Sequence, residues 1–103
     1  MNSYVVNLYP VPNESGLGEA IDVTSSAAVQ FATSFDPKTS CVLVSVQHGD
    51  MYVTFDGSTP SSTNGIYIKS YYTNYWSKES ARVAKMIAVG GQTAHVRIAQ
   101  FTY

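Results

Sequence analysis

Alternation of apolar and polar positions, the pattern of a half-buried β-strand, recurs along most of this chain. Within residues 29–35 the odd positions carry Val, Phe, Thr and Phe, whereas the even positions carry Gln, Ala and Ser. Residues 51–55 alternate in the same way, with Met, Val and Phe predicted to point inward. Shorter strands are predicted at residues 21–23 and 66–70. The pattern therefore indicates a protein built mainly from short strands.

One segment departs from this alternation. Residues 41–46 are apolar at nearly every position, which predicts a central strand that is covered on both faces. Gly49-Asp50 follows, a glycine-first pair that suits a two-residue hairpin loop. Residues 41–46 and 51–55 are therefore expected to pair. Cys41, the one cysteine of the chain, heads this strand and is expected to be a buried structural thiol.

The C-terminal third predicts a second hairpin. Residues 83–89 fit the spacing of a strand, and their alanines also fit that of a helix. The strand is favoured because Gly90-Gly91 and a long alternating segment, residues 93–102, complete a hairpin. Ahead of both, Ser77 suits the N-cap of a helix of one or two turns at most.

Residues 1–12 are expected to form an edge strand or an extended arm. Residues 4–9 favour a strand, but Pro10 and Pro12 each lack a backbone donor and stop it. No internal repeat or linker divides the chain, so residues 1–103 are expected to be a single domain. The fold class predicted is all-β: an antiparallel β-sandwich or small barrel of seven to eight strands, with at most one short helical turn.

Composition adds a surface that is unusually poor in charge. Charged residues make up 13% of the chain, about half the globular average of about 25%, and the net charge is −1. A nucleic-acid binder would show a basic excess, so that class is excluded. No apolar run approaches the roughly 18 residues of a membrane span. We expect much of this surface to be packed against other proteins.

The residues that could carry chemistry have simpler interpretations. No G-x-S-x-G motif is present, and the candidate bases, His48 and His95, are both expected to be solvated residues beside turns. Asp36, Asp50 and Asp56 stand at strand ends, where aspartate commonly forms turns. The chain is therefore expected not to be an enzyme and to hold no metal or other cofactor.

A cluster of aromatic residues has three interpretations. Four aromatic side chains fall within six residues: Tyr71, Tyr72, Tyr75 and Trp76. They could form a protein contact, since Tyr and Trp dominate interface energetics, or a platform on which a sugar stacks. The third interpretation places Trp76 in the core with the tyrosines at its rim.

The N-terminal segment adds Tyr4 and Tyr9 to the predicted interface. A β domain with so few charges leaves strand edges that invite pairing, unless prolines or partners block them. Pro10 and Pro12 protect one edge only. We therefore expect a homo-oligomer, with a trimer favoured, that docks onto a larger assembly.

From residue 42 onward the chain resembles small virion proteins of tailed bacteriophages, of the capsid decoration (cement) type. The resemblance rests on these segments: Val44-Ser45-Val46, Gly49-Asp50-Met51-Tyr52-Val53-Thr54-Phe55-Asp56-Gly57-Ser58-Thr59-Pro60, Asn64-Gly65, Trp76-Ser77, Ala84-Lys85-Met86-Ile87 and Ala99-Gln100-Phe101-Thr102. It implies a structural protein that binds the major capsid protein or other virion subunits. It also implies a location in the virion, assembled in the host cytoplasm.

The strand followed by Asp-Gly-Ser-Thr-Pro is also similar to Ig-like modules of bacterial glycoside hydrolases. A chain that stands alone, from Met1 to a C-terminal strand ending at Tyr103, favours the virion protein. Two alternatives stay open. One is a carbohydrate- or receptor-binding module on a fibre or cell surface, supported by Trp76 and the polar residues 58–64. The other is a head–tail or tail component.

Overall fold

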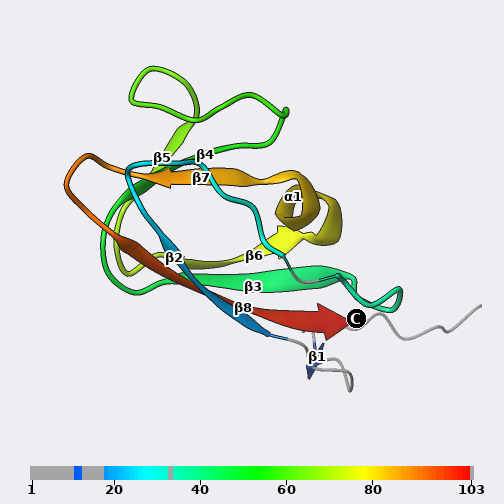
Figure 1. Ribbon diagram of the computed structural model, residues 1–103. Helices are drawn as coiled ribbons and strands as arrows, with labels where there is room; N and C mark the ends of the chain where they lie inside the picture. Colours follow the sequence, from blue (N-terminus) through cyan, green and yellow to red (C-terminus); the bar gives the residue numbers. More distant parts are fainter. Residues whose placement is uncertain (1–10, 13–17, 33, 103) are drawn as a thin grey trace, which may run out of the picture.

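The computed structural model describes residues 11–12, 18–32 and 34–102. They form two antiparallel β-sheets in two layers, which confirms the predicted all-β sandwich (Figure 1). The large sheet contains β1 (Val11–Pro12), β2 (Glu19–Val23), β3 (Cys41–Val46), β6 (Thr73–Ser77) and β8 (Ala94–Thr102). The small sheet contains β4 (Met51–Thr54), β5 (Ile66–Ile68) and β7 (Lys85–Ala88).

The longest strand, β8, lies inside the large sheet. β3 pairs with one side of β8, while β2 and β1 pair with successive parts of the other side. β6 pairs with the far side of β3 and forms an edge of the sheet. The short pairing of Val11 and Pro12 with the end of β8 is an edge pairing, as the prolines predict. Residues 1–10, with the predicted strand 4–9, lie outside the described residues.

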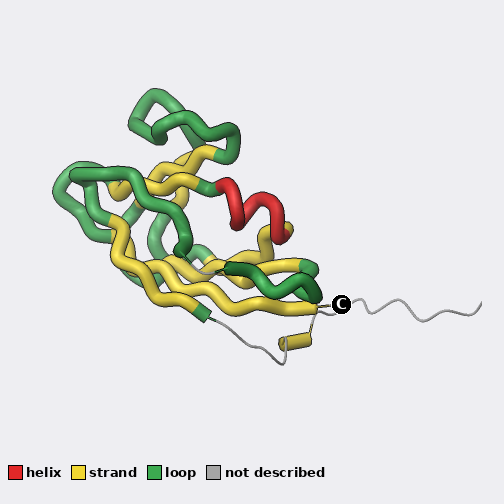
Figure 2. The backbone as a smooth tube through the Cα atoms, turned by 45° about the vertical axis from the view of Figure 1, so that its right-hand side comes forward, coloured by secondary structure: helices red, strands yellow, loops and turns green. Residues whose placement is uncertain are grey.

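The small sheet has the order β5–β4–β7. Its outer edge at β7 is extended by the chain that leaves β2, because Val29 exchanges two backbone hydrogen bonds of 2.9 Å with Met86. The loop 56–65 joins β4 to β5 and projects from the body of the sandwich, as Figures 1 and 2 show.

The core lies between the sheets and is made of the inward-facing strand residues. Small and medium apolar side chains dominate it, together with Trp76 and two methionines. The buried core residues are Val23, Val42, Val44, Val46, Met51, Val53, Ile68, Trp76, Ala81, Ala84, Met86, Ala88, Ala94, Val96 and Ile98. Cys41 is buried as well, as predicted.

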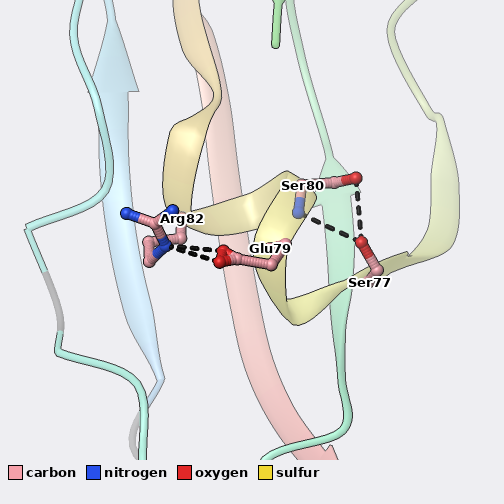
Figure 3. A network of polar contacts seen from close by, with 4 residues as sticks. All are labelled: Ser77, Glu79, Ser80 and Arg82. Atoms are coloured by element: carbon pink, nitrogen blue, oxygen red, sulfur yellow. Dashed lines mark hydrogen bonds and ion pairs between the residues drawn. The ribbon is translucent and has the colours of Figure 1, made fainter. Parts of the chain in front are cut away.

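One helix, α1 (Lys78–Val83), links β6 of the large sheet to β7 of the small sheet. Ser77 caps it as predicted, because its Oγ accepts a hydrogen bond of 3.1 Å from the Ser80 backbone N–H (Figure 3). The Glu79 carboxylate and the Arg82 guanidinium form an ion pair of 2.7 Å one turn apart. The apolar side of this helix contributes Ala81 to the core.

Both predicted hairpins are wrong. β3 and β8 belong to the large sheet, whereas β4 and β7 belong to the small sheet, so the two glycine turns carry the chain between layers. The turns also pack on each other: a Cβ on Gly49, whose φ is +79°, would lie 2.2 Å from the Thr93 carbonyl oxygen. A tight glycine turn serves a sandwich corner as well as a hairpin, and alternation does not say which sheet a strand joins.

The strand predicted at residues 29–35 is also wrong. Only Val29 makes a β-bridge there, and residue 33 lies outside the described residues. The backbone finds side-chain partners in place of a strand: the Ala32 N–H donates to Glu19 Oε2 at 3.1 Å, and the Asp36 N–H donates to Gln100 Oε1 at 2.9 Å. The apolar–polar alternation of residues 29–35 reflects packing on the core, since Phe31 and Phe35 contact it.

Candidate functional site

The predicted aromatic cluster divides between core and surface. Trp76 is 8% exposed; its ring packs edge-on against Phe55, with centroids 5.3 Å apart. Its Nε1–H donates a hydrogen bond of 2.8 Å to the hydroxyl of Tyr72, which is half-buried. Trp76 is thus a core residue with Tyr72 at its rim, and its buried ring is not a platform for a sugar.

Tyr75 and Tyr71 are the exposed members of the cluster, at 43% and 76%. Tyr75 neighbours Trp76 on β6, and successive strand residues point to opposite faces, so its ring lies on the outer face of the large sheet. Tyr71 stands in the corner between β5 and β6 with a φ of +68°, a conformation that costs a residue with a side chain about 1–3 kcal/mol. Tyr4 and Tyr9 lie outside the described residues.

The central strand β3 is fully covered on its inner face and only partly on its outer face, where Cys41 is buried but Leu43 and Ser45 are not, so the predicted cover on both faces is incomplete. Val42, Val44 and Val46 point into the core and are fully buried. Leu43 and Ser45 point outward and are half-buried. The outer face of β3 is therefore open at Leu43.

Tyr75 and Ala99 stand opposite Leu43, from β6 and β8 respectively. The Tyr75 and Phe101 rings meet edge to face with centroids 5.5 Å apart. We call Leu43, Tyr75, Ala99 and Phe101 the apolar patch. It contains no charged side chain and lies on a regular part of the sheet, so it offers a firm, flat and neutral surface.

The free edge of β6, beside this patch, is partly blocked. The Val46 N–H donates to the Tyr72 carbonyl at 2.8 Å. In an antiparallel pair, every second residue of a strand bonds to the partner strand. The backbone N–H and C=O groups of the even-numbered residues of β6 therefore bond to β3, and those of the odd-numbered residues point to the free edge of the sheet. The outward Tyr75 N–H donates to the Asn74 side chain at 2.8 Å. A donor that another strand could have used is therefore occupied, and contact through side chains is favoured over pairing of strands.

A second group of side chains gathers where the large sheet meets the two glycine corners. His95 Nδ1 lies 2.7 Å from Asp22 Oδ1, and the His95 ring stands edge-on to that of His48 at 5.9 Å. His48 also contacts Tyr71, with centroids 5.7 Å apart. Both histidines are exposed, as the sequence predicts, but the sequence did not predict that they meet. The register of β3 and β8 brings them together.

Asp22 orients His95 as a carboxylate orients a histidine base. Within the described residues, the His95 ring hydrogen-bonds to no other side chain, and no three His, Cys, Asp or Glu side chains gather as a metal-binding set. The geometry of this group is that of an exposed polar corner.

Asp50 organises the corner between β3 and β4. Its carboxylate accepts hydrogen bonds from the Tyr67 hydroxyl at 2.5 Å and from the Ser70 N–H at 2.9 Å. These two bonds, the Tyr67 bond first, hold the pKa of Asp50 below its usual range. Reciprocally, the Asp50 bond raises the pKa of Tyr67. Asp50 therefore forms the predicted turn and also holds β5 against this corner.

Comparison of the chain with protein-family models, curated proteins and solved structures finds no match. Among the described residues, no helix has the length and apolar character that crossing a membrane would require.

Proposed function

We propose that this chain is a non-enzymatic structural protein of a tailed-phage particle, which forms a homo-oligomer and binds the capsid surface to stabilise it. The observation that carries the proposal is the outer face of β3. The sequence of this strand is apolar toward both sides, yet the described chain buries the valine side fully and leaves Leu43 on the outer side only half-buried. A partner on the apolar patch supplies the missing cover.

The chemistry of the patch favours a protein as this partner. Aromatic residues are enriched in the central parts of protein interfaces, and charged residues are depleted there. Tyr75 and Phe101 support each other and flank Leu43 in a rigid sheet, so little side-chain entropy is lost on contact. The nearest outward position on β8 beyond the patch is Arg97, which is exposed and suits the polar rim of such an interface.

Two further features support a virion as the setting. The charged fraction of 13% is low for a protein that circulates freely, and it suits a subunit held in an assembly. The resemblance of residues 42–103 to capsid decoration proteins supplies the particular partner, the major capsid protein.

The self-association is tested with a pair of variants on one strand. Leu43→Thr replaces the centre of the patch with a residue that suits a strand, while Ser45→Thr changes the same face two residues away. Sedimentation velocity on the full chain at tens of micromolar is expected to give monomer for Leu43→Thr and oligomer for wild type and Ser45→Thr. Equal sedimentation of all three proteins would refute the role of the patch.

The virion part is tested on particles. Particles purified from a phage that encodes this chain are expected to contain it in many copies, and particles without it are expected to lose infectivity at a lower temperature. Particles that lack the protein, or that resist heat equally without it, would remove the capsid assignment while leaving the oligomer untouched.

A further inference from the structure

The outer face of the small sheet carries a hollow of a different kind. We call it the small-sheet groove; its volume is about 500 Å³, which falls within the range of small-molecule sites. Residues from four separate stretches of the chain line it: Ser25, Tyr52, Pro60, Ser61, Ser62, Ile87, Ala88, Val89 and Gly90. It belongs to the layer opposite the apolar patch, so the two surfaces are separate.

One wall of the groove is the loop 56–65, which is held by its own hydrogen bonds. The Asn64 side-chain amide donates to Ser58 Oγ and to the Thr59 carbonyl, both at 3.0 Å. Lys85 on β7 ties the loop down from outside by donating to the Gly57 carbonyl at 2.9 Å. Pro60 is fully buried at the base of the loop. The wall is therefore formed before any ligand arrives, which lowers the cost of binding.

The floor of the groove is aromatic and aliphatic. Tyr52 on β4 and Ile87 on β7 stand directly opposite each other. The Tyr52 ring is supported from its other side by Tyr67, with centroids 5.8 Å apart, and the Tyr67 hydroxyl is itself bound to Asp50 at 2.5 Å. This chain of contacts holds the Tyr52 ring in place.

The lining combines apolar surface with the hydroxyls of three serines and one tyrosine, and it carries no acid, amine, guanidinium or imidazole. The hydroxyls of Ser25, Ser62 and Tyr52 make no hydrogen bond to any described residue, so they are free to donate to and accept from a ligand. The lining thus selects for a molecule that is neutral, rich in hydroxyl groups and apolar on one face. A pyranose has these three properties, because its axial C–H bonds form an apolar face and its hydroxyls lie around the rim.

We propose that the small-sheet groove binds a short neutral saccharide, with a sugar ring on Tyr52 and sugar hydroxyls on the serines of the loop wall. The site differs from the predicted platform on Trp76, and it stands independently of the proposed virion role. An anionic ligand would find no cation in the lining, and a long lipid chain would leave the serine hydroxyls without partners.

The test is an NMR titration of the intact, isotope-labelled chain with three neutral tetrasaccharides: cellotetraose, maltotetraose and chitotetraose. At least one of them is expected to shift the amide signals of Ser61, Ser62 and Gly90 in a saturable manner, with signals of the apolar patch unmoved. Absence of saturable shifts at the groove with all three sugars at 10 mM would overturn the proposal, as would shifts centred on another surface.

Variants sharpen the test. Tyr52→Ala is expected to weaken binding about tenfold or more through loss of the stacked ring. Tyr71→Ala removes an exposed tyrosine that lines neither the groove nor the apolar patch, and it is the matched control that binds as wild type. Gly90→Leu guards against a folding artefact at Tyr52: a Cβ at Gly90 meets nothing within 4 Å, so leucine fits without a clash and adds bulk to a residue that lines the groove. Unchanged affinity in both Tyr52→Ala and Gly90→Leu would contradict the site.

Discussion

The two sheets of this sandwich present opposite kinds of outer face. On the large sheet, Leu43, Tyr75, Ala99 and Phe101 make a flat apolar surface without a wall. On the small sheet, the loop 56–65 stands beside the strands and forms one wall of an open hollow lined by hydroxyls and apolar side chains. A flat apolar face suits another protein, whereas a walled face with free hydroxyls suits a small ligand. The loop, more than the strands, makes the difference.

The largest expected difference in the free energy of unfolding is between substitutions on the inner and the outer face of the large sheet. Trp76→Ala is expected to lower the free energy of unfolding by about 3–5 kcal/mol, because it opens a cavity in the core. Its neighbour Tyr75→Ala is expected to lower it by less than about 1 kcal/mol while weakening self-association. Chemical denaturation and sedimentation measure the two effects. Similar losses of stability in both variants would erase the distinction between core and interface on β6.

A smaller effect is expected at the wall of the small-sheet groove. Asn64→Ala removes two hydrogen bonds from the loop 56–65, each worth about 0.5–1.5 kcal/mol and less at an exposed position. Saccharide binding is expected to weaken because the wall is no longer held, while the oligomeric state stays as in wild type. A change in oligomeric state would mean that the two faces are coupled.

Acid is expected to loosen the small-sheet face before the large-sheet face. The lowered pKa of Asp50 means that its ionised form stabilises the fold at pH values above about 4, the ordinary carboxylate range. This contribution disappears as the pH falls through the lowered pKa. Asp50→Asn and Tyr67→Phe are each expected to flatten the decline of stability in acid, measured by denaturation at pH 2 to 5. A decline as steep as that of wild type in both variants would argue against the Asp50–Tyr67 bond as its source.

The smallest effect is expected at the ion pair on α1. Glu79 and Arg82 are 69% and 60% exposed and touch neither outer face, and exposed pairs of this kind contribute little. Glu79→Gln is therefore expected to leave thermal stability, oligomeric state and saccharide binding as in wild type. A clear change in any of the three would show that α1 takes part in one of the two surfaces.

Local features of the fold were predictable from the sequence, but the pairing of strands was not. The strand at residues 41–46, the strand predicted at 51–55 and observed at 51–54, and the cap at Ser77 each reflect local physics and are confirmed. The glycine corners were interpreted as hairpins because a short glycine turn looks the same whether the next strand stays in the sheet or leaves it. Residues 29–35 alternate because they pack on the core, although they bond to side chains in place of a strand.

The candidate sites depend on this pairing and were therefore only partly predictable. Tyr75 was identified from its neighbours in sequence, and its contact with Phe101 arises from the order β8–β3–β6. The small-sheet groove draws on Ser25, Tyr52 and Gly90, which no local pattern connects. The predicted cover on both faces of β3 is incomplete in the described chain. The apolar outer side of β3, on which that prediction was based, is the reason for expecting a partner on the apolar patch.

The central claim is that the outer face of the large sheet is an interface between proteins. Light scattering on the purified full chain at tens of micromolar measures it most directly. Three copies of the 11.2 kDa chain are expected to give about 34 kDa, with Leu43→Thr shifting the mass to that of one chain. A wild-type mass equal to that of one chain throughout this concentration range would contradict the account.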